Sequence, residues 1–141
     1  MKDIHTGSTP VGSAPGEFVT IGSTTFFVAS TPSTSFELWK TDGTASGTEL
    51  VKDVWPGTRS SLVVPGVPGR GSLTNLNGTL IFVATTPPTG TELWKTDGTE
   101  AGTVLLKDIN PGPDWSVPTE LTVANGRLFF IANDGTSGVE L

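Results

Sequence analysis

The feature that most limits how this chain can fold is an internal repeat. The segment Glu-Leu-Trp-Lys-Thr-Asp-Gly-Thr stands at residues 37–44 and returns unchanged at residues 92–99. Each copy is followed, two residues later, by a Gly-Thr pair and then by an apolar segment ending in Lys-Asp-Val or Lys-Asp-Ile. A further Lys-Asp-Ile opens the chain at residues 2–4. Such self-similarity is typical of repeat architectures, in which each unit buries its apolar face against its neighbours.

An apolar, Phe-rich segment precedes each Glu-Leu pair, and it occurs three times. The distance from its central phenylalanine to the following leucine is 11 residues in every copy, for Phe27 and Leu38, Phe82 and Leu93, and Phe130 and Leu141. The distances from Lys2, Lys52 and Lys107 to the next such phenylalanine are 25, 30 and 23 residues. One half of the unit therefore has a fixed length, and the other half contains a Pro/Gly-rich connection of variable length.

Each unit is expected to contain four strands. The first covers residues 18–21, 73–76 or 121–124, the second is the Phe-rich segment, the third contains Glu-Leu-Trp-Lys-Thr, and the fourth ends at the Lys-Asp pair. Asn77-Gly78 and Asn125-Gly126 separate the first two strands and predict type I′ turns, because both central residues of that turn need a positive φ. A lone antiparallel meander is only marginally stable, so we expect the units to pack face to face.

The sequence therefore predicts an all-β fold, a β-propeller built of four-stranded antiparallel blades with about three blades per chain. Residues 1–141 would form a single repeat domain, with approximate blades at residues 5–54, 55–109 and 110–141. We expect the last blade to be completed by residues 1–4 of the same or another chain. This expectation rests on the resemblance of residues 134–141, joined to residues 1–4, to residues 42–54.

Three blades are too few for a closed ring, since propellers have about four to eight. Two chains would supply six, and C2 is the commonest symmetry of soluble oligomers. We therefore expect a homodimer that forms one six-bladed ring. Two alternatives stay open: a head-to-tail contact that does not close and gives a fibre, and a fragment of a longer repeat array.

The composition argues against several kinds of partner. The chain carries 8 basic and 14 acidic residues and a formal net charge of −6, so we expect no nucleic-acid surface, which needs clustered Lys and Arg. No apolar run approaches the roughly 20 residues of a membrane-spanning helix, and we expect no membrane insertion. Charged residues follow Met1 at once, so we expect no signal peptide within this sequence. Cysteine is absent, which excludes disulfides and thiol chemistry.

No catalytic arrangement stands out from the repeat. His5 is the only histidine, and a Ser-His-Asp triad needs an oriented histidine beside a nucleophile. No pair of carboxylates departs from the repeat pattern, as a pair for glycoside hydrolysis should. We therefore expect no enzyme activity, no metal and no cofactor, and we keep a polysaccharide-active propeller enzyme only as the last alternative.

The repeated aromatic residues are expected to pack between blades, where an aromatic side chain buries a large apolar area. These residues are Phe27, Phe82, Phe130, Trp39 and Trp94. Trp39 and Trp94 should point to the face opposite the leucine that precedes each of them. A tryptophan could instead stack on a sugar ring, so that interpretation stays open for both.

The repeated charged residues also have structural interpretations. Asp42 and Asp97 are expected to form turns, since a Ca²⁺ site would need about six to eight oxygen ligands. The repeated lysines, each followed by an aspartate, are interpreted as solvated charges that protect an outer strand; they are Lys2, Lys52 and Lys107. The glutamates would form a structural ladder, line a central channel or pair with the repeat lysines; they are Glu37, Glu92 and Glu140.

Two further tryptophans lie in the variable connections. Trp55 and Arg59 belong to one connection, and Asp114 and Trp115 to another. A tryptophan beside Arg or Asp in a polar loop is the usual composition of a shallow carbohydrate-binding surface, which combines stacking with hydrogen bonding. These four residues are therefore the candidate ligand-binding residues, with a glycan as the possible partner. The tryptophans could equally cap the edge of a blade.

The shared motif, with the Gly-Thr, Lys-Asp-Ile and Pro-Gly that follow it, resembles the ELWxxDGT repeats of large bacterial secreted and surface proteins, sometimes called hyalin-like. The resemblance spans nearly the whole chain. The hairpin layout is also similar to a kelch blade, although the kelch Gly-Gly doublet is missing. The resemblance implies an extracellular or cell-surface repeat architecture and no established reaction. We therefore expect a non-catalytic, self-associating module for adhesion or scaffolding, with a lectin as the alternative.

Overall fold

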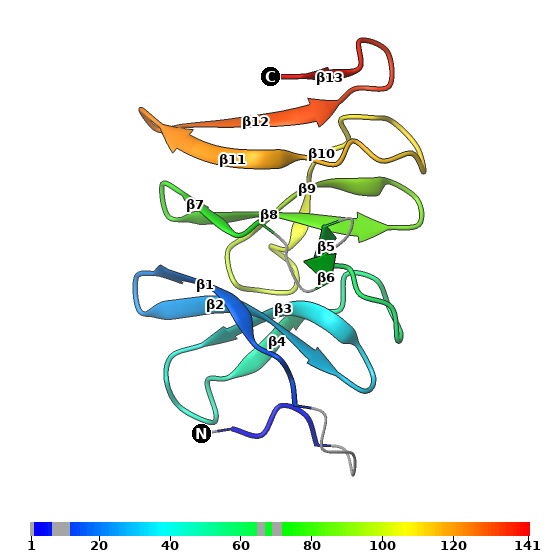
Figure 1. The fold of residues 1–141 in the computed structure, drawn as a ribbon. Coiled ribbons are helices and arrows are strands. Elements are labelled where there is room, and N and C mark those ends of the chain that lie inside the picture. The colour runs from blue at the N-terminus through cyan, green and yellow to red at the C-terminus, as the bar shows by residue number, and fades with distance from the viewer. Residues whose placement is uncertain (1, 7–11, 65–66, 69–71) are drawn as a thin grey trace.

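The computed structural model describes residues 2–6, 12–64, 67–68 and 72–141. Within these residues the chain forms three small antiparallel sheets and one short hairpin. Figure 1 shows the sheets stacked one above another in chain order, as an open stack that does not close on itself. The all-β prediction is thus confirmed as a stack of antiparallel sheets. None of the described segments is a helix with the length and apolarity to cross a membrane.

The first two sheets have four strands each, in simple meander order. The first sheet contains β1 (Gly16–Ile21), β2 (Thr24–Thr31), β3 (Ser35–Thr41) and β4 (Glu49–Lys52). The second contains β7 (Thr74–Leu76), β8 (Thr79–Thr86), β9 (Gly90–Thr96) and β10 (Val104–Lys107). The third contains β11 (Thr119–Ala124), β12 (Arg127–Asn133) and β13 (Val139–Glu140). The hairpin of β5 (Val63–Val64) and β6 (Val67–Pro68) lies in the connection between the first two sheets.

The hairpin turns between the first two strands of a unit follow from their Asn-Gly pairs. Asn77 and Gly78 have φ values of 51° and 90°, and Asn125 and Gly126 have values of 50° and 72°. Asn and Gly tolerate this left-handed region better than other residues. The predicted turns with two positive φ angles are therefore confirmed.

The three sheets share one register. Ala29 pairs with Glu37, Ala84 with Glu92 and Ala132 with Glu140. This pairing corrects the alignment of residues 134–141 with residues 42–50. Asp134 and Gly135 lie in the hairpin between the second and third strands of their unit, whereas the Asp42 turn follows the third strand. Both turns contain Asp-Gly because that pair suits a tight turn, and only the register tells them apart.

Residues 2–6 form no strand within this single chain, whose described residues contain no pairing partner for them. Instead, Ile4 packs against Phe27, Ala29 and Trp39 on the outer face of the first sheet. Completion of the third unit by these residues from a second chain stays a prediction.

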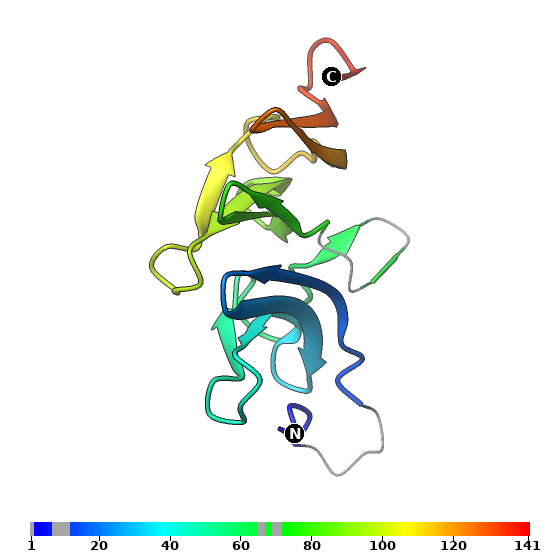
Figure 2. The same cartoon turned by 90° about the vertical axis from the view of Figure 1, so that its left-hand side faces the viewer.

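Apolar clusters join the sheets face to face, and Figure 2 shows the stack from the side. Side chains alternate between the two faces of a strand, so Phe26, Val28 and Leu38 face the second sheet while Phe27 and Trp39 face the other way. The first cluster also contains Leu80, Phe82 and Ala84 from β8. The opposite face of the second sheet, with Ile81, Val83 and Leu93, packs against Leu121, Leu128 and Phe130 of the third. Face-to-face packing of the units is thereby confirmed.

Candidate functional site

The turn after the third strand is held by the side chains of its own motif. Asp97 Oδ1 accepts hydrogen bonds from the N–H and the hydroxyl of Thr99, at 2.8 and 2.7 Å. The Thr99 hydroxyl oxygen accepts from the Gly102 N–H at 2.9 Å, and the Thr103 hydroxyl donates to the Thr99 carbonyl at 2.6 Å. The first copy forms the same network on Asp42, Thr44, Gly47 and Thr48.

This network explains why aspartate and glycine occur together in the motif. Hydrogen bonds from Thr44 and Thr99 stabilise the charged carboxylates, so the pKa values of Asp42 and Asp97 lie below the usual aspartate value. A Cβ at Gly47 or Gly102 would lie 2.1 Å from an Oδ1 atom of that aspartate. The interpretation of both aspartates as turn-forming is confirmed. The described part of the chain contains no group of three or more His, Asp or Glu that could hold a metal ion.

The repeat glutamate binds the connection that leads to the next sheet. Glu37 is fully buried. Its Oε1 accepts from the Ser61 N–H at 2.9 Å, and its Oε2 accepts from the Val54 N–H at 3.2 Å and from the Ser61 hydroxyl. We call this arrangement the glutamate clamp.

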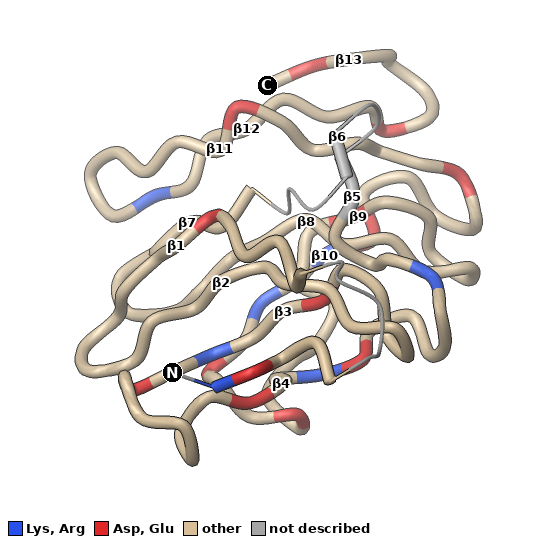
Figure 3. Tube along the Cα trace, turned by 60° about the horizontal axis from the view of Figure 1, so that its bottom comes forward, with Lys and Arg blue, Asp and Glu red and all other residues tan. Residues whose placement is uncertain are grey.

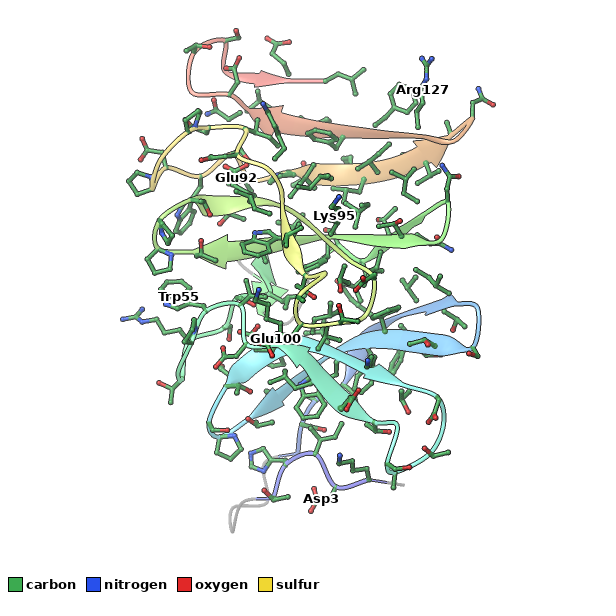
Figure 4. All side chains as sticks on the ribbon, turned by 180° about the vertical axis from the view of Figure 1, so that it is seen from behind. Asp3, Trp55, Glu92, Lys95, Glu100 and Arg127 are labelled. Atoms are coloured by element: carbon green, nitrogen blue, oxygen red, sulfur yellow. The ribbon has the colours of Figure 1, made fainter. Side chains whose placement is uncertain are left out.

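Glu92 forms a second glutamate clamp on the equivalent residues. Its carboxylate accepts from the Ile109 N–H at 3.0 Å, from the Ser116 N–H at 3.2 Å and from the Ser116 hydroxyl at 2.6 Å. Figure 4 shows the Glu92 side chain against the connection that follows the second sheet. The interpretation of the glutamates as channel-lining residues or lysine partners is wrong for Glu37 and Glu92, because both carboxylates are buried against backbone N–H groups.

Burial controls the ionisation of the first clamp. Desolvation raises the pKa of Glu37 from 4.5 to about 8, although hydrogen bonds from Ser61 and Val54 favour the charged form and oppose the shift. Near neutral pH this carboxyl is therefore mainly protonated in the folded chain. A protonated Oε2 can donate to the Ser61 hydroxyl oxygen, which keeps the buried group hydrogen-bonded.

The repeat lysines join neighbouring units. Lys52 Nζ donates to the Thr103 carbonyl of the second sheet at 2.9 Å, and Lys2 Nζ donates to the equivalent Thr48 carbonyl of the first sheet at 2.6 Å. Lys40 Nζ donates to the Gly98 carbonyl at 2.7 Å and forms an ion pair with Glu49 at 3.0 Å. The interpretation of Lys2 and Lys52 as solvated edge charges is therefore wrong. Lys107 is exposed on β10, and Figure 3 shows the basic residues at separate places along the chain.

The strand tryptophans are structural. Trp39 is 8% exposed and lies in the cluster with Phe27 and Ala29. Trp94 packs against the cluster between the first two sheets. The preceding Leu38 and Leu93 lie on the opposite faces of their sheets, as predicted. Trp39 is therefore covered by apolar neighbours, and Trp94 is partly buried against the apolar cluster between the first two sheets.

The four candidate ligand-binding residues lie in two different connections. Trp55 is half-buried at the edge of the stack (Figure 4), and the Arg59 guanidinium carbon lies 5.5 Å from the centre of its ring. That distance fits a cation–π contact. Trp115 is 54% exposed, and Asp114 beside it is also exposed. The Asp114 carbonyl and the Trp115 ring lie so close to Gly90 that a Cβ there would clash with both. Trp55 thus lies in the connection between the first two sheets, and Trp115 lies in the connection between the second and third.

Two other features contain no additional site. A shallow hollow beside the Asp97 turn is lined by Thr79, Lys95, Thr96, Asp97, Ala101, Gly102 and Val104. Its Thr96 hydroxyl already hydrogen-bonds Thr103 and the Gly98 N–H, and Asp97 is used within the turn. His5 lies near the start of the chain, where its N–H donates to Asp3 Oδ1 at 3.1 Å.

The serine partners of the clamps were missed at the level of sequence, although a signal exists. Ser61 and Ser116 both follow their clamp glutamate by 24 residues, and Val54 and Ile109 both follow it by 17. The equal spacing in two units marks these residues as partners of the glutamate. Comparisons of this chain with protein-family models, with curated proteins and with solved structures found no match.

Proposed function

We propose that this chain is a non-catalytic β-propeller repeat module that associates with further copies of itself and serves in adhesion or scaffolding. One observation supports this proposal above the others. The polar side chains of the shared motif hold a turn or join two neighbouring units, as the Asp97 turn, the glutamate clamps and the Lys52 contact do. A motif whose hydrogen-bonding groups are used in this way has a structural purpose.

The propeller assignment rests on the repeated face-to-face packing. Meanders that stack with the same register on either side are the building blocks of a propeller ring. Three units from each of two copies would supply six blades, which is within the usual range. An extracellular or cell-surface location follows from the resemblance to the ELWxxDGT repeats and belongs to the same proposal.

Sedimentation velocity over a dilution series at micromolar concentrations tests self-association. We expect the weight-average sedimentation coefficient to rise with concentration, because the outer faces of the stack carry apolar residues. A coefficient that stays at the value of a 14.6-kDa monomer throughout the series would contradict the proposal.

A lectin is the second candidate, and the exposure of Trp115 favours it. An exposed indole beside an exposed carboxylate offers both a stacking surface and a hydrogen-bond acceptor for a sugar. A glycan array probed with the wild-type chain tests this candidate, with Trp115→Ala expected to lose the signal and Leu106→Ala, also on an exposed side chain, expected to keep it. Absence of binding by the wild-type chain would remove the lectin candidate and leave the scaffold proposal in place.

A further inference from the structure

The two outer faces of the stack are not alike, and each corresponds to a face that is covered inside the stack. In the first sheet, Phe26 and Leu38 face the second sheet and are 4% and 0% exposed. Their register equivalents in the third sheet are Phe129 and Leu141, which are 42% and 88% exposed. The outer face of the third sheet is therefore equivalent to the faces of the first and second sheets that are buried against the next sheet.

The outer face of the first sheet is the matching half. Its Phe27 and Trp39 are 4% and 8% exposed, because Ile4 and Leu50 pack against them. They are equivalent to Phe82 and Trp94, which pack against the preceding sheet in a cluster that also contains Val54. Phe18 lies on this face, is 62% exposed, and stacks on Phe27 with ring centres 5.7 Å apart. Its equivalent in the second sheet, Leu73, packs against the cluster between the sheets. The chain thus carries both halves of its own sheet-to-sheet interface.

A third glutamate clamp has its acceptor at one end of the stack and its hydrogen-bond donors at the other. Glu140 is equivalent to Glu37 and Glu92 by register, but it is exposed. Its expected donors would be the equivalents of Ser61 and Val54.

Ser13 is the equivalent of Ser61, because its carbonyl accepts from the Ser30 N–H as that of Ser61 accepts from the Thr85 N–H, both at 2.8 Å. Ile4 is the equivalent of Val54, because Lys2 and Lys52, two residues earlier, donate to equivalent threonine carbonyls. The donors of the third clamp therefore lie at the start of the chain, beside the first sheet.

We propose that a second copy of this chain seats its first sheet on the exposed face of the third sheet, and that Glu140 of one copy accepts hydrogen bonds from Ser13 and Ile4 of the other. The proposal rests on the proposed self-association and specifies which surfaces meet. The contact is heterologous, so two copies that each offer both surfaces can close a ring, and copies that do not close would extend as a fibre.

A mixing experiment tests which surfaces meet. Phe129→Asp damages only the third-sheet face, and Phe18→Asp damages only the first-sheet face. The Phe129 and Phe18 side chains are 42% and 62% exposed, so each variant should fold, which circular dichroism checks. We expect each variant alone to sediment as a monomer and an equimolar mixture to contain dimers, because the mixture restores one intact pair of faces.

Different failures of this experiment have different meanings. If Phe18→Asp alone still forms dimers, or if the mixture stays monomeric while the wild-type chain associates, the head-to-tail contact is wrong and self-association survives. If the wild-type chain itself stays monomeric, the proposed function fails as well.

The clamp is tested in the wild-type background by Glu140→Ala against Glu100→Ala. Glu100 is exposed in the Asp97 turn, and alanine occupies its equivalent position, Ala45, in the first unit. Both changes remove one negative charge. We expect Glu140→Ala to raise the dissociation constant by at least about tenfold and Glu100→Ala to leave it unchanged. Equal effects of the two variants would contradict the assignment of Glu140.

Discussion

At the level of single residues, the polar side chains of the repeat have two separate tasks. Thr, Asp and Gly close the turn after the third strand, as the Asp97 and Thr99 contacts illustrate. Glu and Lys reach out of their own strand to the connection or the next unit, as Glu37 and Lys52 do. This division explains why the motif combines residue types that a strand and a tight turn would not need by themselves.

The hydrogen bonds of Asp97 in the turn predict that position 102 requires glycine. A methyl group there would meet Asp97 Oδ1 at 2.1 Å, so Gly102→Ala must displace the carboxylate and break its bonds to Thr99. We expect the free energy of unfolding to fall by about 1–3 kcal/mol, the range for overpacking. Chemical denaturation measures it, with Glu100→Ala in the same turn as a control expected within about 0.5 kcal/mol of the wild type. Equal stability of the two variants would show that the turn tolerates the methyl group.

The burial of Glu37 in its clamp predicts that the free energy of unfolding depends on pH. The pKa of Glu37 is about 8 in the folded chain and 4.5 without burial, so the folded state binds the proton more tightly. The contribution of Glu37 to the free energy of unfolding is therefore fully present below pH 4.5 and is lost as the pH rises to about 8. Each pKa unit of the difference corresponds to about 1.4 kcal/mol.

Glu37→Gln should remove that slope, because glutamine does not titrate. Urea denaturation of both chains at several pH values between 4.5 and 8 makes the comparison. A slope that is the same in the variant and the wild type would show that Glu37 does not change its proton occupancy on unfolding.

At the level of strands and sheets, the second strand supplies the apolar contacts that join the units. Phe82 is fully buried between the first two sheets. Phe82→Ala should lower the free energy of unfolding by about 3–5 kcal/mol, the usual cost of removing a buried phenylalanine ring. Leu106→Ala, on a side chain that is 40% exposed, serves as the control and should have a much smaller effect. An unchanged thermal midpoint for Phe82→Ala would contradict the packing of β8.

The strands and their turns could be predicted because their signals are local. Asn77-Gly78 and the alternation of Phe26 and Phe27 fix a turn and two faces with no knowledge of distant residues. The glutamate clamps could not be predicted in this way, since a glutamate gives no indication of which backbone N–H groups, 17 and 24 residues away, will reach it.

The place of the Asp134 turn and the residues with positive φ also could not be predicted, because they depend on strand register and backbone geometry. The Asp134 turn resembles the Asp42 turn in sequence because the same Asp-Gly chemistry suits both places, and only the pairing of Ala132 with Glu140 separates them. A residue with positive φ also stands in the first strand of a unit or two residues before it, namely Glu17, Ser72 and Glu120 with values of 52°, 48° and 57°. In β1 and β11 this residue lies at a β-bulge. These residue types differ and rarely adopt such angles, so nothing in the sequence marks the position.

At the level of the whole molecule, the open stack follows from the repetition. Each unit has one face for the unit before it and one for the unit after it, so a row of units always ends in two unlike faces. Phe129 and Leu141 at one end, and Phe18 at the other, are more exposed than their equivalents inside the stack. Large apolar side chains gathered on an exposed face are typical of an interaction surface, and the two unlike faces are complementary.

Native mass spectrometry of the wild-type chain counts the copies in the assembly and so tests whether two copies form one ring. We expect one dominant species at twice the 14.6-kDa chain mass, since two copies supply the six units of a closed ring. A spectrum that contains only single chains at every concentration would contradict self-association, and a continuous ladder of larger species would contradict closure of the ring.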